Sequence, residues 1–89
     1  MTLKIQKSAN DGFVILTLSG RIQTEHLAEL KDLFDLESTN RRIVLDLKEV
    51  KLVDREAVMF LMRCKGAGIG LKNCPAYIRE WIRKEVERR

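Results

Sequence analysis

Residues 41–58, which read RRIVLDLKEVKLVDREAV, constrain the fold of this chain more than any other segment. A basic pair leads into an apolar run at residues 43–47, which predicts a buried central strand covered on its faces. After a short connector, the apolar pair Leu52 and Val53 ends at Asp54, and apolar side chains then recur at helical spacing. Because Asp is a favoured N-cap residue, the segment predicts a strand followed at once by a helix that begins after Asp54.

The segments before this region predict a hairpin and a helix. Residues 3–6 alternate apolar and polar side chains, Asn10-Asp11-Gly12 is a turn signal, and residues 13–18 are again strand-like. Gly20 is expected to bend the chain out of the sheet over residues 19–22. Thr24 is the expected N-cap of the first helix, which should end near residues 38–40.

The segments after this region predict a short strand and a last helix. Gly66-Ala67-Gly68 should end the second helix, residues 69–71 should form a strand, and Pro75 should occupy the first position of the third helix. We expect the core-facing side chains of the three helices to be Leu27, Leu30, Leu33, Phe34, Ala57, Phe60, Leu61, Cys64, Ile78, Ile82 and Val86. On the second helix, Arg55, Met59, Met62 and Arg63 should instead face outward.

The predicted order is therefore β-β-α-β-α-β-α. Strands that alternate with helices imply right-handed crossovers onto a mixed, mostly parallel sheet packed by helices, so the fold class is α/β. We expect one domain over residues 1–89, with its core at about residues 3–86. No apolar run approaches the roughly 20 residues of a membrane span, so we expect a cytoplasmic protein without membrane insertion.

The strand, connector and helix start at residues 43–58 resemble the signature of the STAS domain, found in sulfate transporters and anti-sigma-factor antagonists. The turn Ser19-Gly20-Arg21-Ile22 resembles the same family. In that family an Asp-Ser-Ser-Gly stretch opens the helix, and its first serine accepts the regulatory phosphate. This chain has Asp54-Arg55-Glu56-Ala57 there, so it resembles a single-domain bacterial STAS protein that lacks the phosphorylatable serine.

Each candidate catalytic, metal-binding or phosphate-binding residue has a structural role that accounts for it. Asp46 and Asp54 are both expected near the carboxyl edge of the sheet, where a carboxylate pair can hold Mg²⁺ or act as acid and base, but strand-end and N-cap roles account for them. His26, the only histidine, has no evident nucleophile beside it. The glycines of Gly66-x-Gly68-x-Gly70 follow a helix, whereas a phosphate-binding loop follows a strand. We therefore predict no enzyme activity, no metal and no cofactor.

Two cysteines, Cys64 and Cys74, lack Cys-x-x-Cys spacing, and we interpret them as free, partly buried thiols. Cys74 precedes the third helix, and the N-terminus of that helix could lower its pKa.

Charge is distributed unevenly along the chain, whose net charge is +4. Residues 24–38 hold five acids and one base, whereas residues 39–74 hold eight bases and four acids. This asymmetry favours association with an oppositely charged partner, including a second copy in a homodimer. Acids are interspersed among the bases and no nucleic-acid-binding motif is present, so we expect no nucleic-acid partner.

These features predict a non-catalytic regulatory protein that acts through protein–protein interaction, with the partner surface formed by Asp54, Arg55, Glu56, Met59, Met62 and Arg63. The STAS resemblance implies either an anti-sigma-factor-antagonist-like protein in signal transduction or a protein bound to a transporter ATPase, and a sensor protein is a further possible partner. The alternative is a small-molecule or nucleotide sensor whose pocket contains Asp46, Asp54 and Arg55 at the start of the second helix.

Overall fold

The computed structural model describes residues 3–10, 12–37 and 42–88, and its elements follow the predicted order. The strands are β1 (Lys4–Asn10), β2 (Phe13–Ile22), β3 (Arg42–Val53) and β4 (Gly70–Lys72). The helices are the 3₁₀-helix η1 (Thr24–His26), α1 (Leu27–Glu37), α2 (Arg55–Gly66) and α3 (Ala76–Glu87). The sheet order is β1-β2-β3-β4, in which β1 is antiparallel to β2 and the other pairs are parallel. The predicted α/β class with a mixed, mostly parallel sheet is confirmed.

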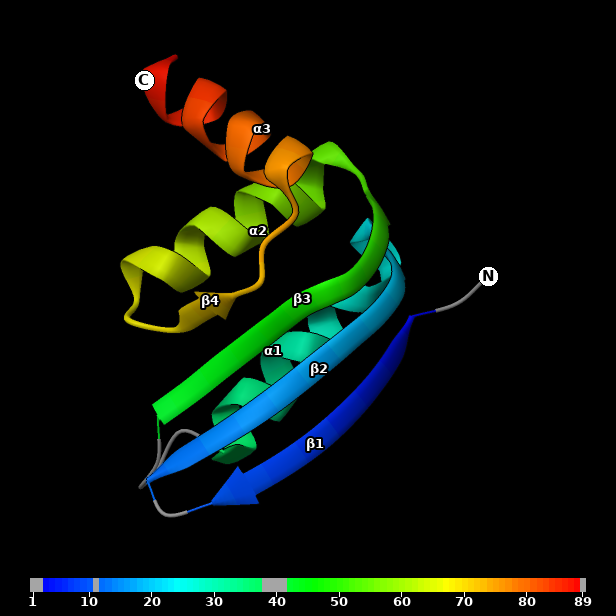
Figure 1. Ribbon diagram of the computed structural model, residues 1–89, viewed down its shortest axis with the longest axis vertical. Helices are drawn as coiled ribbons and strands as arrows, with labels where there is room; N and C mark the ends of the chain where they lie inside the picture. The colour runs from blue at the N-terminus through cyan, green and yellow to red at the C-terminus, as the bar shows by residue number, and fades with distance from the viewer. Residues whose placement is uncertain (1–2, 11, 38–41, 89) are drawn as a thin grey trace.

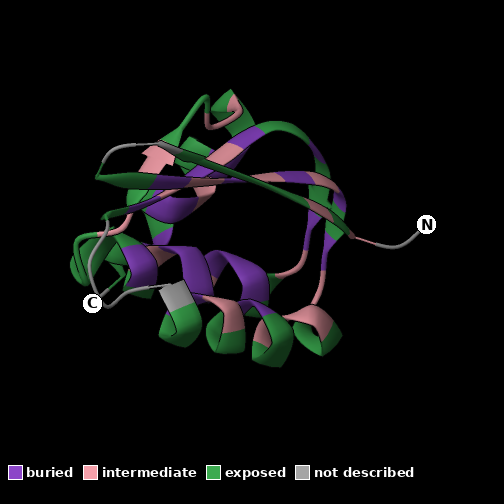
Figure 2. Ribbon diagram, turned by 90° about the horizontal axis from the view of Figure 1, so that it is seen from below, coloured by how far each residue is buried: buried purple, intermediate pink, exposed green. Residues whose placement is uncertain are grey.

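Helices α1 and α2 cover the same face of the sheet, and α3 packs against α2 (Figures 1 and 2). One hydrophobic cluster joins the three helices to the strands. Its fully buried large side chains are Leu16, Leu18, Ile22, Leu30, Leu45, Leu47, Leu61, Ile78, Val14 and Val58. Within the described ranges, no helix is both long and apolar enough to cross a membrane.

Strand β3 differs from its prediction in two ways. The apolar run at residues 43–47 and the later pair at Leu52 and Val53 belong to one continuous strand. Its side chains also alternate in burial: Ile43 and Leu45 are buried beneath the helices, whereas Val44 is only half-buried on the other face. The expectation of a strand covered on both faces is therefore wrong, because α1 and α2 lie on the same side.

The predicted departure from the sheet at residues 19–22 is also wrong. These residues continue β2, because the long β3 provides backbone partners for them: Ser19 pairs with Glu49 and Ile22 with Val53. Gly20 does have a positive φ of 95°, and the pairing register shifts next to it. The glycine therefore permits an irregularity inside the strand and does not end it.

The helix starts are predicted to within one residue. Asp54 is the N-cap of α2, as expected. Gln23, rather than Thr24, occupies the N-cap position of η1, and Thr24 is the first residue of that short helix. Pro75 is the N-cap of α3, one position before the predicted one. In each case the chain enters the helix from an extended backbone, which the residue before the first turn supplies.

The inward faces of the helices are largely as predicted, with three exceptions. Leu33, expected in the core, is only half-buried and is not among the described side chains that pack against the core cluster. Val58 of α2 is fully buried in the core cluster, although its inward position was not predicted. Val86 is 54% exposed, and Glu85 takes the inward position in its place with only 7% exposure. Glu85 lies seven residues after Ile78, which places both on one stripe of α3. The expectation that Val86 packs in the core is wrong.

Two predictions involve residues outside the described ranges: Asp11 in the first turn, and the end of the first helix at residues 38–40. Around them, Gly12 has the positive φ of 86° expected of a turn glycine, and its carbonyl accepts a hydrogen bond from the backbone N–H of Arg42.

Candidate protein-binding site

Asp54 joins the starts of two helices. One carboxylate oxygen, Oδ1, accepts a hydrogen bond from the backbone N–H of Ala57 at 2.8 Å, which caps α2. The other oxygen, Oδ2, accepts from the backbone N–H of Thr24 at 2.9 Å and from its hydroxyl at 3.0 Å. The ends of β2 and β3 bring these residues together, because Ile22 pairs with Val53 in the parallel sheet. Asp54 therefore has the structural role we expected and also binds Thr24, which we had not predicted.

These hydrogen bonds alter the acidity of Asp54. Partial burial raises its pKa, but the hydrogen bonds from Ala57 and Thr24 outweigh that effect, so the pKa lies below its usual value. The folded protein therefore favours the ionised carboxylate, which accepts all three hydrogen bonds. A carboxylate held in this way is a poor proton donor or acceptor near neutral pH.

Arg55 binds the last helix. Its Nε lies 3.5 Å from Oε2 of the buried Glu85, although the arginine side chain itself is 63% exposed. The indole Nε1 of Trp81 donates a hydrogen bond of 3.3 Å to the same oxygen. Burial raises the pKa of Glu85, and the contacts with Trp81 and Arg55 reverse that effect, so the pKa is lowered overall. Sequence analysis did not identify Glu85 or Trp81 as neighbours of Arg55.

The remaining residues of the predicted surface line the outer side of α2. Glu56 and Arg63 are exposed, and Met59 is half-buried. Met62 is also half-buried, and it packs against the hydrophobic core cluster. Met59 is not among the described side chains that pack there. The two methionines therefore differ: Met62 serves partly as core, whereas Met59 is the more available for contact.

Asp46 lies apart from this region. It is in the middle of β3, where Oδ1 accepts hydrogen bonds from the backbone N–H of Lys48 at 3.0 Å and from the Asn73 side chain at 3.2 Å. Partial burial raises its pKa, but these bonds and the charges of Lys48 and Lys72 lower it below the usual value. The expectation that Asp46 lies at the strand end beside Asp54 is wrong, because β3 continues to Val53. The described residues contain no group of acids, histidines or cysteines placed to hold a metal ion.

The histidine caps a short helix, and both thiols are at least partly buried. Nδ1 of His26 accepts a hydrogen bond from the backbone N–H of Gln23 at 3.2 Å, which stabilises the start of η1. Both cysteines are free, as expected. Burial raises the pKa of the Cys64 thiol to about 11, and burial also raises that of Cys74, so the expected lowering at the start of α3 is not found.

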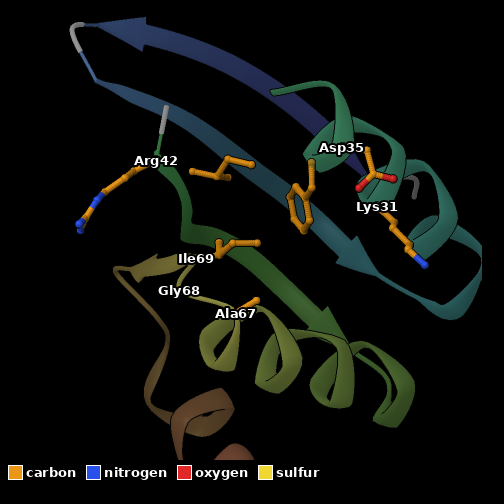
Figure 3. A pocket seen from close by; sticks show the side chains of 8 residues that line it. Lys31, Asp35, Arg42, Ala67, Gly68 and Ile69 are labelled. Atoms are coloured by element: carbon orange, nitrogen blue, oxygen red, sulfur yellow. The ribbon is translucent and has the colours of Figure 1, made fainter. Parts of the chain in front are cut away.

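An open groove of about 430 Å³ runs between α1 and α2, and we call it the α1–α2 groove. Its main lining residues are Leu27, Lys31, Phe34, Phe60, Arg63 and Ile69. The rings of Phe34 and Phe60 stack at its base with centroids 5.6 Å apart. The groove continues into a second hollow toward the start of β3 (Figure 3), where Ile69 points inward and the charged ends of Lys31 and Arg42 point away from the interior. Sequence analysis did not predict this groove.

Comparison with known families identifies the class of this protein. The family model described as the Mlab STAS domain matches residues 5–84. The chain therefore belongs to the STAS family, and the resemblance seen in the sequence is confirmed. No curated protein sequence matches the chain significantly. Membership supports a regulatory class of protein.

Solved structures show the same fold. The unphosphorylated anti-sigma factor antagonist SpoIIAA matches with a TM-score of 0.65 and 14% identity, over 89% of this chain and 79% of that one. Mglu matches with a TM-score of 0.59 and 25% identity, over 80% of this chain but only 19% of Mglu. An uncharacterized Shewanella loihica protein with a SpoIIAA-like fold matches with a TM-score of 0.53 and 13% identity, over 74% of this chain and 56% of that one. This chain thus spans about a fifth of Mglu and most of SpoIIAA.

Proposed function

We propose that this STAS protein is a non-catalytic regulator that binds a protein partner through the amino-terminal half and outer side of α2. The surface consists of Asp54, Arg55, Glu56, Met59, Met62 and Arg63. Family membership supports a regulatory role. The observation that carries the choice of surface is the half-buried Met59, which lies between exposed arginines and does not pack against the described core.

The composition of this surface suits protein recognition. Methionine has a flexible, polarizable side chain that adapts to the shape of a partner, and arginine is enriched in interfaces. Arg55 and Arg63 lie on either side of Met59 along α2 and are both exposed. Glu85 holds the Arg55 guanidinium group by its Nε, so the partner would meet a positive charge that is already positioned.

We further propose that the protein has no serine phosphorylation switch. Arg55 occupies the position of the family's acceptor serine, and its guanidinium group cannot take up a phosphate ester. We expect mass spectrometry after incubation with kinases of the family to find no phosphate between Lys51 and Met62. A stoichiometric phosphate in that window would contradict the proposal. Arg55→Ser alone should not restore a switch, because Glu56 places a like charge beside any new phosphate.

The sequence Asp54-Arg55-Glu56-Ala57, which differs from the family's Asp-Ser-Ser-Gly, guides the choice between an anti-sigma-factor antagonist and a protein bound to a transporter ATPase. Antagonists of anti-sigma factors release their kinase-type partner when the serine is phosphorylated, and this chain lacks that serine. The missing serine leaves the second role, attachment to a transporter ATPase, open. We therefore favour a constitutive protein partner, with a transporter ATPase as the first candidate and a kinase-type anti-sigma factor or a sensor protein as the others.

Affinity capture with three matched baits tests the proposed surface. The wild-type protein, Met59→Asp and Val86→Asp are each incubated with extract of cells that produce the protein. Val86 is 54% exposed on α3, so Val86→Asp adds the same charge at an apolar position outside the surface. A partner retained by the wild type and by Val86→Asp but lost from Met59→Asp supports the proposal. A partner that all three baits retain equally would contradict it.

The small-molecule alternative has little structural support. Neither Asp54 nor Arg55 lines any of the three described hollows, and Asp46 lies elsewhere on β3. Both oxygens of Asp54 already accept hydrogen bonds from Thr24 and Ala57. A ligand at this point would have to displace bonds that hold two helix starts together.

A further inference from the structure

The α1–α2 groove combines an apolar base with a basic rim. Phe34, Phe60 and Ile69 form its apolar lining, and the exposed side chains of Lys31 and Arg63 lie at its two sides. Neither Lys31 nor Arg63 forms an ion pair with another described residue. An occupant of this groove should therefore present apolar side chains together with acidic ones.

A row of residues on α1 beside the groove has this complementary composition, and its first residue, Ala28, also lines the groove. Ala28, Asp32 and Leu36 follow one another at intervals of four residues and so form a single row along the helix, which we call the α1 ridge. Leu36 is 75% exposed, the highest value among the described large hydrophobic residues. Asp32 is exposed and has no ion-pair partner among the described residues, and the same holds for the neighbouring Glu29.

From this match we infer that two copies of the chain form a two-fold dimer in which the α1 ridge of each copy lies in the α1–α2 groove of the other. In this arrangement the two α1 helices pack antiparallel, and the small Ala28 permits their close approach. Leu36 then covers apolar lining of the partner's groove, and Asp32 faces its Arg63. The inference goes beyond the proposed function and does not depend on it.

The position of both features on one helix favours a second copy over an unrelated partner. A two-fold interface uses the same surface patch on both subunits, so the patch must be complementary to itself. The groove and the ridge border each other along α1, and one contact can therefore fill both grooves at once. The charges of the groove itself also match, because Lys31 and Arg63 line it, whereas the ridge holds Asp32 with Glu29 beside it. An acidic helix of a different protein would satisfy only the groove and leave the ridge exposed.

Sedimentation equilibrium of the purified protein alone tests this inference. The set comprises the wild type, Arg63→Glu, Asp32→Arg, the double variant and Lys65→Glu, each at about 0.05 M and about 0.5 M salt. Lys65→Glu is the matched control: Lys65 and Arg63 both lie in the last turn of α2, so either reversal has the same effect on net charge and helix dipole. Lys65 lines a different hollow, together with Arg79 and Ile82.

We expect a reversible wild-type dimer that weakens as the salt concentration rises. Arg63→Glu and Asp32→Arg should each weaken it roughly tenfold or more, Lys65→Glu should leave it unchanged, and the double variant should recover most of the affinity. Leu36→Ser removes an exposed apolar group without changing charge and should also weaken the dimer. A monomeric wild type, equal effects of Arg63→Glu and Lys65→Glu, or a double variant no better than its parents would overturn the inference. Because no partner protein is present, failure here leaves the proposed partner surface unaffected.

Discussion

The start and the middle of α2 use polar side chains in different ways. At the start, Asp54 binds Thr24 and Ala57, and Arg55 binds Glu85, so both charged groups contact other elements of the same chain. In the middle, Met59 is half-buried, and in the last turn Arg63 is exposed without an ion pair to any described residue. Within the proposed partner surface, the first turn therefore also stabilises the fold, whereas we propose that Met59 and Arg63 serve in binding.

This difference bears on the position of the family's phosphate acceptor. A serine there is a small group that a kinase can modify, whereas Arg55 reaches across to the last helix and contacts a buried carboxylate. The contact connects α2 to α3, and Trp81 supports it by donating to the same oxygen of Glu85. The position that we propose corresponds to the family's acceptor serine thus contributes to a helix–helix contact in this chain.

The largest effect on stability should come from Asp54→Ala. The change removes the N-cap of α2 and leaves the N–H and hydroxyl of Thr24 without their acceptor, so we expect a loss of about 2 kcal/mol, the upper end for an N-cap. Urea unfolding followed by circular dichroism measures the loss. A loss below about 0.5 kcal/mol would show that the hydrogen bonds of Asp54 do not stabilise the start of α2.

Asp54→Asn sharpens this test. The asparagine oxygen can still accept from Ala57, but its amide group cannot accept from Thr24. The variant should therefore fall between the wild type and Asp54→Ala. If it has normal stability yet fails to bind the partner, the carboxylate acts in recognition and its structural role is minor.

The contribution of Asp54 should depend on pH. Its pKa in the folded protein is lowered, so the stabilisation is fully present above the unfolded pKa of about 3.9. The stabilisation is lost as the pH falls from there through the lower folded pKa. The difference in unfolding free energy between the wild type and Asp54→Ala should accordingly narrow below about pH 4. A difference that stays constant down to the acid transition would mean that the ionised carboxylate is not what stabilises the fold.

Arg55→Ala should have a smaller effect than Asp54→Ala. The arginine side chain is largely exposed, and ion pairs with such groups are screened by solvent. We expect the urea midpoint to fall by less than half as much as for Asp54→Ala. Glu85→Gln, which keeps an acceptor for Trp81, should resemble it. A fall in urea midpoint as large as that of Asp54→Ala would show that the Arg55 contact stabilises the fold as strongly as the Asp54 cap does.

The period of apolar residues, together with turn and capping signals, was sufficient to predict the element order, most of the inward face of α2 and the N-cap role of Asp54. The lengths of β2 and β3 were not predictable in the same way, because each strand continues only where the other provides hydrogen-bond partners. Gly20 adds to the difficulty, because a glycine indicates a bend both where a strand ends and where it continues after an irregularity. Pairing across the sheet is a long-range property that local patterns do not contain.

The long-range contacts of the candidate site were likewise not predictable from local sequence patterns. The exposed arginines followed from helical spacing, but the bond between Thr24 and Asp54 joins residues 30 positions apart. A parallel pairing of β2 with β3 would have indicated it, since a helix follows each strand at the same edge. Glu85 did leave a signal, because it is an acid seven residues after Ile78 on the apolar stripe of α3. A buried acid at such a position requires a partner for its charge, which Arg55 provides.

The most direct test of the account compares Met59→Asp with the wild type in two measurements: urea unfolding and the affinity for the captured partner. Because Met59 does not pack against the described core, we predict a stability within about 0.5 kcal/mol of the wild type together with loss of partner binding. Val86→Asp should retain both properties. A large loss of stability would show that Met59 is part of the core, and unchanged stability with unchanged affinity would contradict the assignment of the outer side of α2 as the partner surface.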